Sequence, residues 1–150
     1  MPSQQKQFYY HISNYPLHTH DSCEVTLKPL DYGDNRAQEE PDDARICVAP
    51  SVPHCLIALG TLATEYGDRL FIYRTKNKVV GKPPYDVPDA CVTKEWWLTR
   101  KTKFVLKKEV VISYKLTEMM HELGNVGSIS CIKRQSEVLK KLKKHRELYS

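Results

Sequence analysis

The sequence has no long hydrophobic run, and its longest uncharged apolar stretch, from Val52 to Thr64, contains a proline and a histidine. A helix needs about 20 mainly apolar residues to cross a bilayer, so no membrane-spanning segment is expected. The first residues also lack the apolar core of a secretory signal. These absences predict a soluble, cytoplasmic protein.

Signatures of disulfides, metals and common cofactors are missing as well. The five cysteines are scattered without a Cys-x-x-Cys pair, which predicts free thiols rather than a disulfide framework. The segment from His18 to Cys23 holds several possible metal ligands, but no second cluster completes a coordination shell, so no metal is expected. The glycine-rich dinucleotide and phosphate-loop motifs are absent, as are the serine-hydrolase and zinc-protease motifs.

The sequence contains enough apolar residues to form a folded domain. The 150 residues are 41% hydrophobic and 27% charged, which is typical of a globular protein and excludes a disordered chain. The net charge of +5 is unevenly distributed. Residues 132–150 carry seven lysines and arginines against two glutamates, so the rest of the chain is formally neutral.

Hydrophobic periodicity gives an order of elements along the chain. Residues 14–44 lack periodicity and are expected to be irregular. The pattern predicts strands over 7–13, 45–49, 69–74, 90–98 and 103–114, and helices over 51–66, 116–123 and 131–149. Strands without regularly intervening helices indicate an α+β fold. We expect a body over 1–114, with a central helix packed on an antiparallel sheet, and a C-terminal helical extension over 115–150.

The first predicted strand contains a candidate binding pair. Because side chains alternate along a strand, His11 and Ser13 lie on one face of it. A histidine and a hydroxyl at this spacing can together bind a polar ligand such as a ribose diol. The alternative interpretation is a structural histidine, hydrogen-bonded within the core or at the sheet edge.

Two turn-forming segments carry aromatic and acidic side chains that could line a cleft. One runs from Asp31 to Arg36, and the other from Pro83 to Asp89, with Glu95 following it. Acidic residues and asparagine also occur in turns for conformational reasons alone. A purely structural role for each therefore stays open.

Taken in order, these segments resemble a known family. A strand with Tyr-x-His-x-Ser, a loop with tyrosine and Asn-Arg, "RICVAPSV", "RLFIYRT", a Pro/Asp loop and "VTKEWWL" follow one another over about residues 7–112. This order is similar to the small ADP-ribosyltransferase-like fold, particularly the rifampicin ADP-ribosyltransferases and the RNA 2′-phosphotransferases. The likeness also extends to bacterial and phage proteins, and it implies modification of a host or phage component.

The resemblance implies a split β-sheet that holds NAD in a cleft, with roles for particular residues. His11 would hold the ribose of the nicotinamide half, and Tyr32 would stack on the nicotinamide. Further cofactor-binding positions would be Ser13, Asn35 and Arg36. The catalytic acid would be one of Asp86, Asp89 and Glu95, stabilising positive charge on the ribose as the glycosidic bond breaks.

The sequence departs from the family at one position of this strand. Ile12 stands where the family usually has glycine, whose missing side chain lets the backbone approach the dinucleotide closely. A β-branched residue there stands in the way of that approach.

The basic C-terminal segment suggests a different class of function. Its predicted helix places Lys133, Lys140, Lys141 and Lys144 as a cationic face. The alternative to an enzyme is therefore a non-enzymatic binding or inhibitor module that docks on nucleic acid or an acidic protein through this helix. A solvated face on a terminal helix would explain the same residues without a partner.

Overall fold

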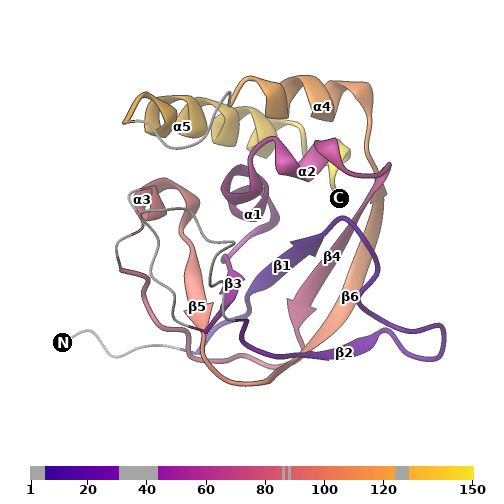
Figure 1. Cartoon of the computed structure of the whole chain (residues 1–150). Helices are drawn as coiled ribbons and strands as arrows, with labels where there is room; N and C mark the ends of the chain where they lie inside the picture. The colour runs from indigo at the N-terminus through magenta and orange to yellow at the C-terminus, as the bar shows by residue number, and fades with distance from the viewer. Residues whose placement is uncertain (1–5, 31–43, 86, 88, 124–128) are drawn as a thin grey trace.

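A four-stranded antiparallel sheet and a separate two-stranded sheet form the frame of the molecule, and the helices gather on one side of it (Figure 1). The computed structural model describes residues 6–30, 44–85, 87, 89–123 and 129–150. The larger sheet has the order β1 (Tyr10–Ser13), β4 (Arg69–Thr75), β6 (Thr102–Val111), β2 (Glu24–Leu27), and the smaller sheet pairs β3 (Ile46–Val48) with β5 (Trp96–Leu98). The predicted α+β fold is confirmed.

One helix near the C-terminus is long, and the other described helices are short. Within the described residues, helices and helical turns are α1 (Val52–Leu59), α2 (Leu62–Glu65), α3 (Ala90–Thr93), α4 (Tyr114–His121), α5 (Ile129–Lys144) and a 3₁₀ turn over Arg146–Leu148. In that part of the chain no helix is long and apolar enough to cross a membrane.

Strand β4 is buried on both of its faces, which explains its continuous apolar sequence. Leu70 and Ile72 face a core formed with the helices, whereas Phe71 and Tyr73 face a second core between the two sheets. Side-chain alternation in a single strand therefore supplies both hydrophobic clusters.

The C-terminal helices share the core of the strands. Met120 on α4 and Leu142 on α5 are fully buried in the same cluster as Leu56 of α1 and Leu70 of β4. Segment 115–150 therefore packs directly on the strand-bearing body.

Backbone hydrogen bonds link the start of β1 to the residue that follows β3. Tyr10 at the start of β1 exchanges two backbone hydrogen bonds with Ala49, which follows β3, at N···O distances of 2.8 and 3.1 Å. Beyond this contact β1 continues with β4, while β3 pairs with β5. The split arrangement opens space between the sheets beside α1.

Several predicted boundaries differ from the structure. The predicted helix over 51–66 begins as expected, with the Ser51 hydroxyl capping the His54 N–H, but it is interrupted at Gly60, whose φ of +63° lies in the left-handed region. Strand β2 lies within the segment predicted to be irregular. The predicted strand over 90–98 starts as the short helix α3, and the C-terminal helix ends at Lys144.

Gly81 permits a close approach that any larger residue prevents. A Cβ at this position would lie 2.8 Å from the Tyr9 hydroxyl oxygen and 3.3 Å from a ring carbon of Trp96. We expect Gly81→Ala to lower the free energy of unfolding by about 1–3 kcal/mol, as overpacking of a filled site does. Urea denaturation measures this loss. If the Tyr9 hydroxyl causes it, the loss is smaller in a Tyr9→Phe background, and an equal loss in both backgrounds would contradict this explanation.

Candidate functional site

A cavity of about 300 Å³ lies where β1 and β3 separate, beside helix α1. His11 reaches it from β1, Cys47 from β3, Cys55 and Leu59 from α1, and Glu95 from the residue before β5. Most of the lining is apolar. Two predicted site residues that lie far apart in the sequence, His11 and Glu95, are thus brought to one cavity.

The His11 ring is held by a backbone hydrogen bond. Its Nδ1 lies 2.9 Å from the carbonyl oxygen of Cys47, and its ring meets Phe104 edge-on at 6.1 Å between centroids. A carbonyl can only accept, so Nδ1 carries the proton. Burial lowers the pKa of His11 below its ordinary value of 6.5 despite this bond. The neutral ring therefore keeps Nε2 as a hydrogen-bond acceptor at neutral pH.

Glu95 is positioned by a tight turn and by an indole. Lys94 has a left-handed backbone, with φ of +56°, at the end of α3, and the Glu95 N–H donates to the Thr93 hydroxyl at 3.2 Å. The Trp97 Nε1–H donates to Glu95 Oε2 at 2.8 Å. Thr93 therefore holds the backbone of Glu95, and Trp97 orients its carboxylate.

The Cys55 thiol at the cavity wall is a poor nucleophile. It donates to the Tyr10 carbonyl oxygen at 3.2 Å, and burial raises its pKa to about 12. Only a thiolate is a strong nucleophile, so Cys55 acts here as a small apolar side chain.

Ile12 forms part of the same wall. Its side chain is 6% exposed and packs in the core with the helices while also lining the cavity. At the position where the resemblance would place glycine, an isoleucine side chain thus lines the cavity together with His11.

The other described candidates are engaged elsewhere. The Ser13 hydroxyl donates to the Tyr15 carbonyl oxygen at 2.7 Å, and Asp89 Oδ2 accepts from Gln135 Nε2 at 3.0 Å, which ties the start of α3 to α5. Neither is among the described residues that line the cavity. Four further candidates lie outside the described residues: Tyr32, Asn35, Arg36 and Asp86.

One histidine of the segment before β2, His18, contacts strand β4. His18 Nδ1 lies 2.8 Å from the Tyr73 hydroxyl oxygen, which also accepts from the Leu17 N–H at 2.7 Å. Across the described part of the chain, no group of three or more metal-binding side chains is close enough to hold an ion.

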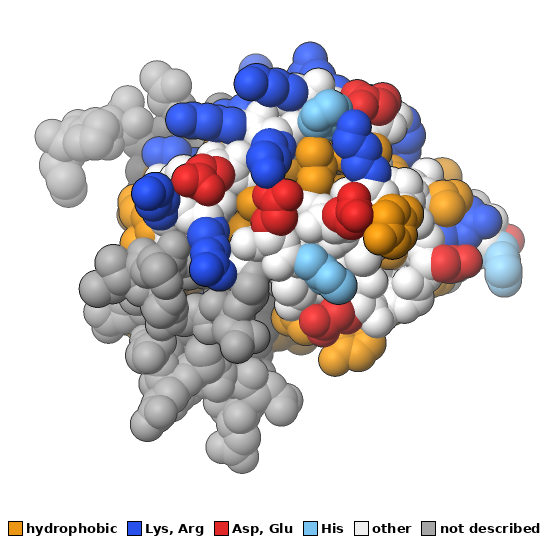
Figure 2. Space-filling model, turned by 90° about the horizontal axis from the view of Figure 1, so that it is seen from above, with side chains coloured by type: hydrophobic (Ala, Val, Ile, Leu, Met, Phe, Trp, Pro, Cys, Tyr) orange, Lys and Arg blue, Asp and Glu red, His pale blue; other side chains and the backbone are white. Residues whose placement is uncertain are grey.

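The cationic face of the C-terminal helix is exposed, but one of its lysines is paired with a glutamate. Lys133, Lys140, Lys141 and Lys144 all face solvent. Lys141 forms a 2.7 Å ion pair with Glu122 from the end of α4. The view onto the helical layer shows blue basic side chains interleaved with red acidic ones (Figure 2).

The lowered pKa of His11 makes stability depend on pH. The unfolded chain binds a proton to this residue near pH 6.5, whereas the folded chain resists protonation. The contribution of His11 to stability is therefore fully present above pH 6.5 and is lost as the pH falls toward the folded pKa.

We expect the melting temperature to fall between pH 7.5 and 5.5. His11→Gln should reduce this fall without abolishing it, since burial and the charges of Lys143 and Lys94 also lower the pKa of His54. An unchanged pH dependence in the variant would contradict this assignment.

Comparisons with known proteins add no family to these observations: no family model, no curated protein and no solved structure matches the chain.

Proposed function

We propose that this protein binds the nicotinamide–ribose half of NAD in the cavity between β1 and β3 and transfers ADP-ribose. The observation that carries the proposal is the convergence of His11 and Glu95. Eighty-four positions separate them in the sequence, yet they line one cavity. A pair consisting of a hydrogen-bond acceptor and a carboxylate in an apolar recess is suited to a sugar next to a positively charged ring.

The size and chemistry of the cavity fit part of the dinucleotide. At about 300 Å³ it lies at the lower end of ligand pockets, so it accommodates a ring with its sugar while the rest of NAD extends outside. The neutral His11 ring offers Nε2 to a ribose hydroxyl. The apolar walls from α1 suit the face of an aromatic ring.

NAD bound in this cavity would supply the ribose. Its bond to nicotinamide would break with the electron pair going to nicotinamide, while an acceptor nucleophile would bond to the same carbon and give its proton to solvent. Glu95 provides a fixed negative charge where positive charge develops on the ribose, and the Trp97 indole keeps this carboxylate oriented. His11 orients the sugar through a hydroxyl. The surrounding apolar side chains exclude water from the recess.

Calorimetric titration with NAD tests binding separately from chemistry. We expect the wild type to bind NAD, and His11→Ala to bind about tenfold more weakly because one hydrogen bond to the ribose is lost. Asp89→Asn is the matched control, since Asp89 pairs with Gln135 away from the cavity, and its affinity should equal that of the wild type. Absence of NAD binding, or equal affinity in His11→Ala, would refute the proposal.

A further inference from the structure

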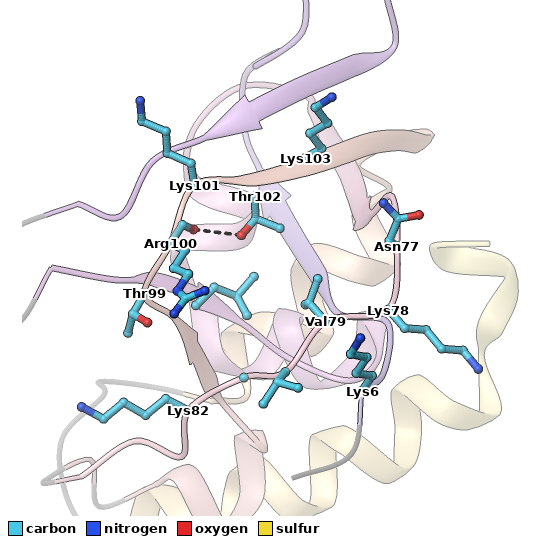
Figure 3. A pocket seen from close by; sticks show the side chains of 13 residues that line it. Lys6, Asn77, Lys78, Val79, Lys82, Thr99, Arg100, Lys101, Thr102 and Lys103 are labelled. Atoms are coloured by element: carbon cyan, nitrogen blue, oxygen red, sulfur yellow. Dashed lines mark hydrogen bonds between the residues drawn. The ribbon is translucent and has the colours of Figure 1, made fainter.

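A second recess, on the β5–β6 side of the molecule, is surrounded by positive charge. Its volume is about 630 Å³, and no acidic residue is among the described residues that line it. The cations come from the segment before β1, the loop after β4 and the connection from β5 into β6. We call this recess the basic pocket and define it by Lys6, Lys78, Lys82, Arg100, Lys101 and Lys103. Figure 3 shows them standing around the rim, with Lys103 across from Lys6.

Among the described residues, one carboxylate is affected by the charge of a basic-pocket cation: besides Lys76, the main cause, Lys103 helps to lower the pKa of Glu24. None of its six cations forms an ion pair with a carboxylate in the described part of the chain. Lys76, two residues before Lys78, differs because it pairs with Glu24. All six side chains are exposed, so they are available to a ligand. Like charges gathered in a recess reinforce one another's potential and attract a polyanion.

The backbone fixes the shape of the recess. Lys82 exchanges two backbone hydrogen bonds with Trp97, at N···O distances of 2.8 and 2.9 Å, so the loop after β4 is fastened to β5. Gly81 lets the same loop pack against Tyr9 and Trp96. The hydroxyl of Thr99 and the amide of Asn77 also line the recess and can donate to phosphate oxygens.

A partly exposed aromatic ring outside the lining of the recess lies next to one of its cations, Lys82. Tyr85 is 43% exposed, its ring centroid lies 5.7 Å from the Lys82 ammonium, and its ring meets that of Trp97 at 5.3 Å. A supported, partly exposed ring beside a lysine matches the combination by which proteins stack a base while holding its phosphate.

We propose that the basic pocket binds a single-stranded nucleic acid through its phosphates. The recess has a volume of about 630 Å³, in the range of ligand pockets, and its cations lie on opposite sides, which suits the phosphates of one strand. This inference stands apart from the NAD proposal, since it involves neither His11 nor Glu95. It also places nucleic-acid binding on the strand-bearing body instead of the C-terminal helix.

Fluorescence anisotropy with a labelled oligothymidylate of about 12 nucleotides tests the proposal without NAD. The pocket variant carries Lys82→Gln, Arg100→Gln and Lys101→Gln. The matched control removes the same charge from α5 through Lys133→Gln, Lys140→Gln and Lys144→Gln. At 0.1 M salt we expect the pocket variant to bind about 100-fold more weakly than the wild type, and its salt slope to fall by about 2, because three phosphate contacts are lost. The control should stay within about threefold of the wild type, since its residues make no phosphate contact.

Stacking is tested by Tyr85→Leu, which keeps an apolar side chain but removes the aromatic ring. We expect about tenfold weaker binding with an unchanged salt slope. All variants change exposed residues, and matching circular dichroism spectra and melting temperatures establish that they are folded.

Three outcomes would overturn the proposal. The first is the absence of oligothymidylate binding by the wild type. The second is weakening by the helix variant equal to or greater than that by the pocket variant. The third is pocket-dependent binding of phosphatidylserine vesicles or free nucleotides with none of the oligonucleotide.

Discussion

Release of nicotinamide from NAD is expected to fall by about 100- to 1,000-fold when Glu95 is replaced by glutamine, the scale seen when one preorganised electrostatic group is removed. Glutamine keeps an oxygen to accept the Trp97 indole N–H, so the orientation of the side chain survives. Only the negative charge next to the ribose is lost. Chromatographic detection of nicotinamide measures the rate, and calorimetric titration measures the affinity of the variant for NAD, which we expect to be retained.

Asp89→Asn is the matched control for this change, because it removes the same charge and leaves an oxygen to accept from Gln135. Its rate should equal that of the wild type. A large loss in Asp89→Asn with none in Glu95→Gln would assign the acid to another residue and contradict the site described above.

Replacing Leu56 with alanine is expected to lower the free energy of unfolding by about 2–5 kcal/mol. Leu56 is fully buried at the centre of the cluster that joins α1 to the strands and the C-terminal helices. The truncated side chain leaves a cavity bounded by several elements, which cannot all collapse into it. Leu62 on α2 is 48% exposed and provides the control. Leu62→Ala should cost less than about 1 kcal/mol, and equal losses at the two positions would contradict this description of the core.

The strands and helices that could be predicted are those for which a few neighbouring residues in the sequence show which side chains are buried. The continuous apolar run of β4 and the serine cap of α1 indicate their structures within a few residues of sequence. Strand β2 was missed because its four residues, Glu24–Leu27, are exposed or only half-buried and owe their conformation to pairing with β6. Such a strand carries little hydrophobic signal of its own.

The sequence identified His11 and Glu95 as candidates by residue type, but it did not show the geometry that brings them to one cavity. The Tyr-x-His-x-Ser pattern singled out His11 and Ser13 equally, and only the meeting of β1 with β3 distinguishes them. His11 faces the Cys47 carbonyl and the cavity, whereas the Ser13 hydroxyl bonds to its near neighbour Tyr15. The spacing of residues along the sequence does not show which distant residues come into contact. The orienting roles of Cys47 and Trp97 were missed for the same reason.

The net charge of each segment of the sequence also gave no indication of the basic pocket. Residues 1–131 are formally neutral, yet folding gathers six of their cations around one recess. The clusters Lys76–Lys78 and Arg100–Lys103 were visible signals in the sequence. They became significant only when the Lys82–Trp97 pairing brought the two segments together.

The indole resonance of Trp97 in a proton–nitrogen correlation spectrum tests the central claim most directly. The chain has two tryptophans, and the Trp97 Nε1–H donates to the Glu95 carboxylate at the cavity. A Trp96→Phe variant assigns the signal. We expect NAD to shift the Trp97 indole resonance saturably in the wild type, with weaker saturation in His11→Ala. A Trp97 resonance that stays in place while NAD binds elsewhere, or while NAD does not bind at all, would contradict the account.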